Sequence, residues 1–528
     1  MTLSILIWLP LALAVICSQL PTRWVGRAIA ALSLAPLGIA VYYVVRFHLG
    51  QPGLQFVTDD VWIGALGIHY KLGLDGLNVA LVLLTTILFS AALWWSAARE
   101  WQRARLYYFW FGLAQSAVLG AFCAQDLALF VAFFDLMLIP FYFLIGMWGS
   151  GERTRATLKL VIYTLVGSFF MLAGAIATGV IASSQHGAPL TFVLSSLRAL
   201  PLSRNTQDWI FLCFAIAFLV KMPLVPFHGW LAEGYKSMPI PAVAVFSGVV
   251  SKVAAYGFLR IVLPLFPYAA RHYQLALLVI ALGSILWGTA MAFTTPDARM
   301  VVAYSSVAQL SFITLGIFSL RTFGTQGALL QMLNHGLVTA AGFFIVGALA
   351  ARAGGSERLE DMGGIAFRAP VFAAMFVFVA LATLAMPGSA NFIGEFLILL
   401  GTFKAKLVVA ILAFLGVVGA SFYALRWFIG AMHNRTGEHV TSFELRLGEG
   451  VAIVPLVAVI LALAFFPQFG LTRSQPTVRE TIAAAHGGQA PALNAARVVP
   501  GGVRRGAGQT TAAGHPRGVA VAATGGSP

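Results

Sequence analysis

Long apolar runs separated by short polar loops dominate this sequence. We count about fourteen runs of about 20 residues, the length that crosses the roughly 30 Å hydrocarbon core of a bilayer as a helix. Only 10% of the residues are charged and 59% are hydrophobic, a balance that soluble domains of this size do not show. The sequence therefore predicts an all-α polytopic membrane protein with about 14 transmembrane helices. The expected spans are residues 3–20, 25–47, 76–96, 106–124, 127–148, 156–183, 209–229, 238–263, 273–293, 299–319, 326–351, 369–402, 407–432 and 450–468.

The apolar runs and the segments between them divide the chain into five parts. Between the second and third runs, an alternating polar and aromatic pattern predicts a short external hairpin, and Asp75 after it is expected to cap the third helix. The C-terminal part is rich in Gly, Ala and Pro without periodicity, which predicts disorder. The five parts are residues 1–105 with helices 1–3 and the hairpin, 106–265 and 266–432 with five helices each, 433–470 with the last helix, and 471–528 as a disordered tail.

Charge and cysteine placement exclude several classes of function. The net charge is +15, but the basic residues are scattered over loops and form no nucleic-acid-binding face. Loops on the side of Arg23 and Arg153 hold more Lys and Arg than the opposite loops, which places both termini outside the cytoplasm. The cysteines all lie inside apolar runs, so the sequence offers neither a disulfide framework nor a metal-ligand spacing. The sequence also contains no phosphate-binding loop, and we expect no cofactor.

Five ionisable residues lie inside or close to the predicted spans. A charged side chain in the middle of a membrane helix costs about 2.5 to 3.5 kcal/mol on insertion scales, so each one is a candidate for function. The five residues are Asp135, Lys221, Lys252, Glu395 and Arg426.

Two of these residues lie beside breaks in their helices. Lys221 is followed at once by Pro223 and Pro226, and Pro387 interrupts another run two turns before Glu395. A break frees backbone carbonyls, which is tolerated in a membrane only where the helix lines a polar cavity or packs against protein. Two broken helices with a charge at each predict a transport path between them.

The spacing of the charges predicts an internal duplication. A constant offset of 174 positions relates Asp135 to Gln309, Lys221 to Glu395, and Lys252 to Arg426. Repeats of five helices each would lie in opposite orientations in the membrane, as in many transporters. The register rests on the charges alone, because the prolines at the breaks align at a different offset.

Ordinary structural roles stay open for several of these residues. Lys221 and Arg426 lie near helix ends, from which a long cation could reach the headgroups. His228 and His335 could each be hydrogen-bonded packing residues. For His335, which lies in mid-helix beside Asn334, a position on a hydrated path is favoured.

A set of short phrases between about residues 70 and 430 resembles a known family. The chain resembles the antiporter-like membrane subunits of NADH-quinone oxidoreductase, respiratory complex I, and the subunit M branch in particular. The order and spacing of the phrases match this family throughout. The phrases are "GLDGLN", "LMLIPFYFLIGMWG", "VKMPLVPFHGWL", "VVSKVAAYGFLRI", "VAYSSVAQLSFITLGI", "QMLNHGLVTAA" and "MPGSANFIGEFLIL".

The resemblance implies a fourteen-helix subunit that translocates protons through two inverted five-helix repeats and carries no cofactor. Its partners would be the other membrane-arm subunits and membrane lipid, with NADH and quinone bound by other subunits, in a bacterial inner membrane. The resemblance also assigns roles. Asp135 would be the helix-5 carboxylate, Lys221 the broken-helix lysine, Lys252 the central relay lysine, Glu395 the second broken-helix carboxylate and His335 the histidine of helix 11.

Two departures from the family pattern leave other functions open. Phe134-Asp135 stands where the family usually has Trp-Glu, and Gln309 where it usually has His. Aspartate reaches about 1.5 Å less far than glutamate, and a glutamine carries no proton. A subunit of an Mrp-type sodium/proton antiporter or of a membrane-bound hydrogenase, and a structural subunit that pumps no protons, are the alternatives.

Overall fold

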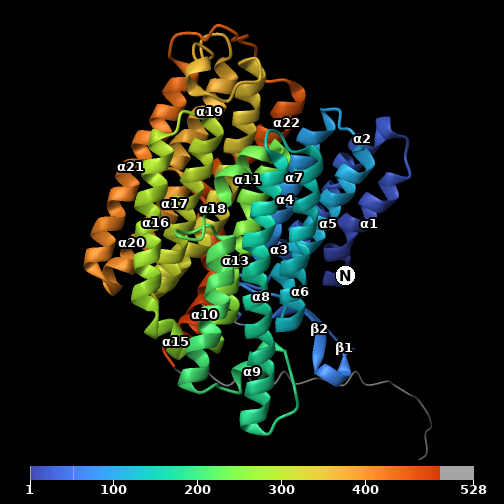
Figure 1. Cartoon of the computed structure of the whole chain (residues 1–528), viewed down its shortest axis with the longest axis vertical. Coiled ribbons are helices and arrows are strands. Elements are labelled where there is room, and N and C mark those ends of the chain that lie inside the picture. The colour runs from blue at the N-terminus through green and yellow to red at the C-terminus, as the bar shows by residue number, and fades with distance from the viewer. Residues whose placement is uncertain (1, 52, 488–528) are drawn as a thin grey trace, which may run out of the picture. The chain divides into compact units, whose positions relative to one another are not determined.

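The computed structural model describes residues 2–51 and 53–487, and most of these residues lie in helices (Figure 1). Eleven helical segments among them are long and apolar enough to cross a membrane. They are α2 (Thr22–Leu32) with α3 (Leu34–Arg46), α4 (Val79–Ala97), α5 (Ala104–Cys123), α6 (Leu127–Leu136) with α7 (Leu138–Trp148), α8 (Arg153–His186), the segment Ile240–Leu265, α16 (Gln274–Thr294), α17 (Ala298–Phe318), α18 (Thr322–Arg352), α21 (Leu407–Met432) and α22 (Leu447–Phe465).

Three of the fourteen expected spans are not among these eleven segments. The first is α1 (Leu3–Ser18), which has only 16 residues. The second, α10 (Arg204–Lys221), ends at the predicted break and continues after it as the short α11 (Leu231–Ser237). The third is divided into α19 (Pro370–Thr383) and α20 (Ala390–Ala405). Both predicted breaks are therefore present.

Side chains close the gap that the first break leaves in the backbone hydrogen bonding. The Trp230 indole nitrogen donates to the Val220 carbonyl at 3.0 Å, and the Val225 amide donates to the Ser284 hydroxyl at 2.9 Å. Polar groups of the protein thus satisfy backbone that lipid could not.

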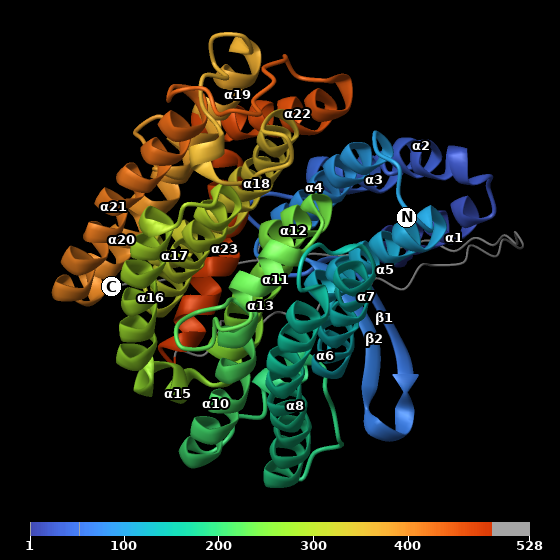
Figure 2. The ribbon, with the colours of Figure 1, turned by 45° about the horizontal axis from the view of Figure 1, so that its top comes forward.

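The span Ile240–Leu265 is a helix with two wide turns. It consists of α12 (Ile240–Val245), the π-turn η2 (Phe246–Val250), α13 (Ser251–Gly257), the π-turn η3 (Phe258–Val262) and α14 (Leu263–Leu265). Every residue of α13 is buried. In both views α13 lies between α6, α7 and α8 on one side and α16, α17 and α18 on the other (Figures 1 and 2). The span thus joins the two halves of the helical bundle.

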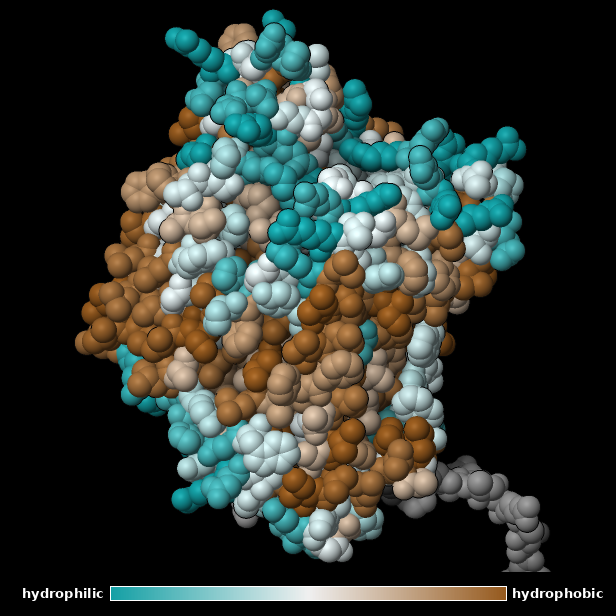
Figure 3. Space-filling model, in the orientation of Figure 1, coloured by the Kyte–Doolittle hydropathy of each residue, from teal (hydrophilic) through white to brown (hydrophobic). Residues whose placement is uncertain are grey.

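Burial separates core helices from helices that face outward. The helices α17 and α18 are almost wholly buried, whereas most of α8 and α21 is not. Most exposed positions of α8 and α21 are apolar. Examples are Phe169, Ile162 and Val408, each at least 59% exposed. Figure 3 shows hydrophobic side chains across the middle of one face, with hydrophilic side chains towards both ends. Such a surface suits hydrocarbon rather than water.

The predicted hairpin is confirmed. Strands β1 (Gln55–Ile63) and β2 (Ile68–Leu74) pair antiparallel around the short 3-10 turn η1 (Gly64–Leu66). Asp59 on β1 is 2.6 Å from the Lys71 ammonium and 2.8 Å from the His69 ring on β2. Partial burial opposes ionisation of Asp59, but hydrogen bonds from Lys71 and His69 outweigh it and lower the pKa of this carboxyl.

The expectation that Asp75 caps the third helix is wrong. The N-cap of α4 is Asn78, and Asp75 instead accepts from the Leu77 amide and forms a buried ion pair with Arg260 at 2.5 Å. Arg260 lies on η3, so this pair ties the start of α4 to the central span.

Disorder from residue 471 onward is also wrong for the first part of the tail. Helix α23 (Gln468–Ala485) buries Val478, Ile482 and Ala485, which are spaced as one helix face, and packs against α18. The rest of the predicted tail, 488–528, lies outside the described residues. The remaining short elements are α9 (Leu194–Arg198), α15 (Pro267–His272) and the 3-10 turn η4 (Leu359–Asp361).

A buried chain of charged and polar side chains

Lys221 is the last residue of α10 and is only 3% exposed. Its ammonium donates to the Phe134 carbonyl at 3.3 Å and lies 4.3 Å from the centre of the Phe134 ring. The C-terminal end of a helix and an aromatic face both favour a cation. Since the side chain is enclosed by protein, Lys221 does not reach the headgroups.

Asp135 follows Phe134 on α6 and is the charged neighbour of Lys221. It lies within electrostatic range of the ammonium and beside Ser168 of α8. The two charged groups are more than 4.0 Å apart, and one oxygen of the carboxylate has no hydrogen-bond partner among the described residues. Asp135 and Lys221 thus face one another as an open pair.

Lys252 is fully buried at the centre of the chain, on α13. Its ammonium donates to the Ser247 carbonyl at 2.5 Å, and the Ser251 hydroxyl donates to the same oxygen at 3.0 Å. Ser247 belongs to the π-turn η2, and turns of this kind occur frequently at functional sites. In the part of the chain that the structure describes, no carboxylate lies within 4.0 Å of Lys252.

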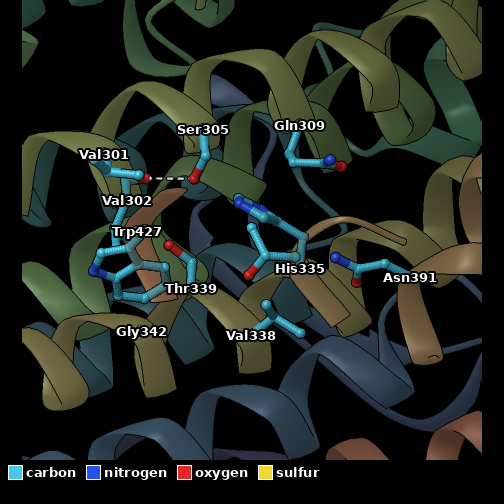
Figure 4. A pocket seen from close by; sticks show the side chains of 11 residues that line it. Val301, Val302, Ser305, Gln309, His335, Val338, Thr339, Gly342, Asn391 and Trp427 are labelled. Carbon is cyan, nitrogen blue, oxygen red and sulfur yellow. Dashed lines mark hydrogen bonds between the residues drawn. The ribbon is translucent and has the colours of Figure 1, made fainter. Parts of the chain in front are cut away.

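His335 on α18 is 2% exposed, and neither ring nitrogen has a hydrogen-bond partner among the described residues. It lies within electrostatic range of Lys252. Its ring faces a small cavity with about 10 Å³ of room, about the space that one water molecule needs (Figure 4). Gln309, Asn391 and Thr339 also line this cavity.

Glu395 on α20 is the carboxylate at the far end of this buried series of side chains, and it is 2% exposed. One of its oxygens accepts from the Gln309 amide at 2.7 Å, and the Gln309 oxygen accepts from Gln331 at the same distance. The second Glu395 oxygen has no partner among the described residues. Gln309 thus connects Glu395 to the cavity beside His335.

Three hydroxyl groups lie between that cavity and Ser247, whose backbone carbonyl holds the Lys252 ammonium; we call Ser247, Ser306 and Thr339 the hydroxyl cluster. Ser306 and Thr339 are 2.9 Å apart, and Ser247 lies 3.2 Å from Ser306 and 3.3 Å from Thr339. Hydroxyl groups both donate and accept, so such a cluster can pass a proton in either direction.

Several buried polar atoms in and near the cavity lack hydrogen-bond partners among the described residues. They include both amide atoms of Asn391 and the Asn334 oxygen. Buried polar groups are nearly always hydrogen-bonded to protein or water. The region is therefore polar enough to hold water between His335 and Glu395, as a proton path requires.

The structure brings most of the predicted residues together, but not all. Arg426 is only partly buried and donates to the Phe293 and Thr295 carbonyls at the end of α16, as a residue at a helix end would. His228 packs against Trp287 with ring centres 4.1 Å apart, and its Nδ1 has no hydrogen-bond partner among the described residues.

The sequence reasoning missed the neutral members of the site. Gln331, Asn391 and the hydroxyl cluster carry no charge, and a charge-based search passes over them. The available signal was a polar residue in mid-span, which Gln331 and Asn391 both provide. No group of three or more His, Cys, Asp or Glu side chains that could hold a metal ion is found in residues 2–51 and 53–487.

Comparison with known proteins gives the class of the fold and the site. Residues 124–422 match the family described as NADH:quinone oxidoreductase/Mrp antiporter, transmembrane part. This match runs from α6 into α21 and includes every charged residue of the buried chain. The protein is thus an antiporter-like, multi-pass membrane subunit.

Longer similarities give the particular branch. The chain is 34% identical to NADH-quinone oxidoreductase subunit M of Mycobacterium tuberculosis, over 97% of this chain and 99% of the relative. It superposes on a chain of respiratory complex I from Thermus thermophilus with a TM-score of 0.84 and 30% identity, covering 92% of this chain and 100% of the other. A chain of the Mrp complex from Dietzia shares the fold at 20% identity, with a TM-score of 0.78 over 92% of this chain and 52% of the other. The chain belongs to the subunit M family of NADH-quinone oxidoreductase, respiratory complex I.

Proposed function

We propose that this chain translocates protons along Asp135, Lys221, Lys252, His335 and Glu395, driven by quinone reduction in other subunits of complex I. The observation that carries the proposal is a series of ionisable side chains inside the molecule, of which Asp135 is half-buried and the others are buried. Hydroxyl and amide groups lie along the series between Lys252 and Glu395. Each such charge is costly in a membrane, and no charged partner within 4.0 Å compensates Lys221 or Lys252 among the described residues. Groups held in this way suit a change of protonation better than a structural role.

The open pair gives the proposal a physical mechanism. With an effective dielectric constant near 20, a carboxylate and an ammonium attract by about 4 kcal/mol at 4 Å and by about 1.7 kcal/mol at 10 Å. Movement of Asp135 toward and away from Lys221 would thus change the stability of the protonated amine by about 2 kcal/mol. Moving one proton against 100 mV costs about 2.3 kcal/mol, so the two quantities are comparable.

We further propose fourteen crossings and two inverted repeats for this subunit. The partners in the structure support the repeat. Asp135 faces Lys221 in the first half. The residues 174 positions further on, Gln309 and Glu395, are hydrogen-bonded to each other in the second half. The third pair gives no support, because Lys252 is fully buried and Arg426 is only partly so.

The chain would need no cofactor of its own, since NADH and quinone would bind other subunits. Its place would be a bacterial inner membrane among the other membrane-arm subunits, with both termini outside the cytoplasm.

One observation favours a second candidate, a structural subunit that pumps no protons. Gln309, which carries no proton, lies between Glu395 and the cavity where the family usually has a histidine. A subunit of an Mrp-type antiporter or of a hydrogenase is less favoured. The subunit M relative is 34% identical over 97% of this chain, whereas the chain of the Mrp complex is only 20% identical and shows a shared fold alone.

Substitution in the assembled complex distinguishes the candidates. Lys221→Ala and Glu395→Gln should abolish most NADH-driven proton uptake by inside-out vesicles, while Lys406→Ala and Glu438→Gln, at exposed positions, should have no effect. If Lys221→Ala and Glu395→Gln both took up as many protons per NADH as wild type, the proton path would be excluded. That result would support the hypothesis of a structural subunit that pumps no protons.

A further inference from the structure

Three arginine side chains surround a hollow at the end of the bundle where α2 and α5 begin and α4 ends. The hollow has about 600 Å³ of room, which lies within the range of sites that bind small molecules. We call it the arginine hollow. The helices that form it carry none of the residues of the buried chain, so it is a separate feature of the molecule. Its walls include Arg23, Arg27, Arg99, Glu100, Trp101 and Tyr108.

The positive charge of the arginine hollow is not neutralised by neighbouring carboxylates. Among the described residues, no carboxylate lies within 4.0 Å of Arg23, Arg27 or Arg99. Arg99 is held by Trp95, because its guanidinium lies 4.0 Å from the centre of that ring and donates to the Trp95 carbonyl at 3.1 Å. Glu100 also lines the hollow, so three cations stand against one carboxylate there. The net positive charge of this concave surface attracts anions.

Neutral hydrogen-bond donors complete the walls of the hollow. The side chain of Tyr108 is 2% exposed and lines it. A Cβ atom on Gly26 would lie 2.6 Å from the Tyr108 hydroxyl oxygen, so the missing side chain at Gly26 leaves room for this hydroxyl. Helices α2 and α5 begin at the hollow, with Thr22 and Ala104, and neither start has a side-chain cap. Arginines, a hydroxyl group and uncapped helix starts can all donate to the oxygens of a phosphate.

The arginine hollow lies where polar and apolar surfaces meet. Figure 3 shows hydrophilic side chains at the end of the molecule where Figure 1 labels α2, next to the hydrophobic band. Trp24 and Leu106 are 49% and 44% exposed, and each lies within two residues of the lining of the hollow. The Arg27 guanidinium lies 5.8 Å from the centre of the Trp24 ring. Tryptophan beside arginine is typical of the headgroup level of a membrane.

These features favour a lipid over a free ion. A phosphate ion in solution would use the arginines alone, whereas a phospholipid would use both the arginines and the exposed apolar side chains beside them. In the expected orientation this end of the bundle faces the cytoplasm, and the cytoplasmic leaflet is the one that holds anionic lipids. Basic pockets between membrane helices on that side are suited to anionic headgroups.

We propose that the arginine hollow binds the phosphate of an anionic phospholipid from the cytoplasmic leaflet. Arg23, Arg27 and Arg99 surround the phosphate, whose oxygens accept from their N–H groups and from the Tyr108 hydroxyl. The acyl chains lie along the exposed apolar side chains of α2 and α5. Binding of this lipid involves no change of protonation, and it does not depend on the proton path.

The test is photolabelling of the whole complex in liposomes. The probe is phosphatidylglycerol with a photoreactive group in one acyl chain, and labelled peptides of α2 and α5 are quantified by mass spectrometry. The same measurement with phosphatidylcholine, which has no net charge, gives the background from ordinary contact with lipid. We expect wild type to show a clear preference for phosphatidylglycerol, expressed as the ratio of labelling by the two probes.

The decisive variant is Arg23→Gln/Arg27→Gln, which removes two exposed cations. Each basic side chain near the surface strengthens the attraction of anionic lipid roughly fivefold, so the labelling ratio should fall about 25-fold. The matched control is Arg368→Gln/Arg435→Gln, at two exposed arginines in other loops, which should keep the wild-type ratio. Equal ratios in wild type and in Arg23→Gln/Arg27→Gln would overturn the proposal.

Two further results would also overturn it. The first is an equal labelling of wild type by both lipids, combined with retention of radioactive inorganic phosphate by wild type but not by Arg23→Gln/Arg27→Gln; the hollow would then be a site for free phosphate. The second is the absence of α2 and α5 labelling by either lipid in the wild-type complex, which would show that another subunit covers the hollow.

Discussion

Replacing Asp135 by asparagine tests the open pair directly. The substitution removes the charge that faces Lys221 while it keeps almost the same size and shape. The two groups are more than 4.0 Å apart, and at separations of about 5 to 8 Å their attraction is about 2 to 3 kcal/mol with a dielectric constant near 20. The protonated form of Lys221 should lose this stabilisation, which corresponds to a change of about 30- to 150-fold in its population relative to the neutral amine.

The assay is the acidification of inside-out vesicles, expressed per NADH oxidised. Asp135→Asn should retain at most a few per cent of the wild-type ratio, since the carboxylate would no longer drive Lys221 between its two forms. Asp135→Glu keeps the charge and extends its reach by about 1.5 Å, so it should pump at least as well as wild type. Asp60→Asn, at an exposed position of the hairpin, is the control. A normal ratio in Asp135→Asn would refute the electrostatic reasoning.

Three further predictions concern other parts of the chain. Gln309→Leu removes the hydrogen bond to Glu395. Since a hydrogen bond to a charged group contributes about 1.5 to 3 kcal/mol, proton uptake per NADH should fall at least tenfold. Unchanged proton uptake per NADH would place Gln309 outside the path. Glu449→Gln deprives the fully buried Arg352 of its ionised partner, 2.9 Å away, and such a loss typically costs about 3 to 5 kcal/mol of stability. Thermal release of this subunit from the purified complex should therefore occur at a lower temperature. An unchanged release temperature would contradict a stabilising role for this ion pair. Because the pKa of Asp59 in the folded hairpin is below that of the unfolded chain, its stabilisation is present above the ordinary value of about 4 and is lost as the pH falls through the folded value. The protection of the hairpin amides, that is, their hydrogen-exchange rate relative to the intrinsic rate at each pH, should therefore fall below about pH 4 in wild type but not in Asp59→Asn. Identical protection profiles for the two proteins would contradict this prediction.

Much of the fold could be predicted from the sequence because local signals specify it. The apolar runs place the helices, Pro223 and Pro387 place the two breaks, and the alternating pattern places the hairpin. The charges inside the predicted spans identify Asp135, Lys221 and Glu395 as candidates for a transport path, because an ionisable side chain in a membrane helix is costly and usually has a functional role.

Other features depend on partners that are distant in sequence. Asp75 lies 185 positions before its partner Arg260, and no local pattern distinguishes a helix cap from half of a buried ion pair. Helix α23 forms because Val478 and Ile482 pack against helices far earlier in the chain, although the residues around them are polar or small. The hydroxyl cluster joins three helical segments, so the single serines and threonine appear ordinary until the fold is known.

The most direct test of a continuous proton path is the number of protons moved per NADH oxidised by the purified complex in liposomes, with Lys252→Met compared with wild type. Lys252 is the buried cation that joins the two halves, and Met keeps most of its volume without the charge. The account predicts that the variant moves fewer protons per NADH while the complex stays assembled. An unchanged number of protons per NADH would contradict a path through Lys252 and, with it, the central claim.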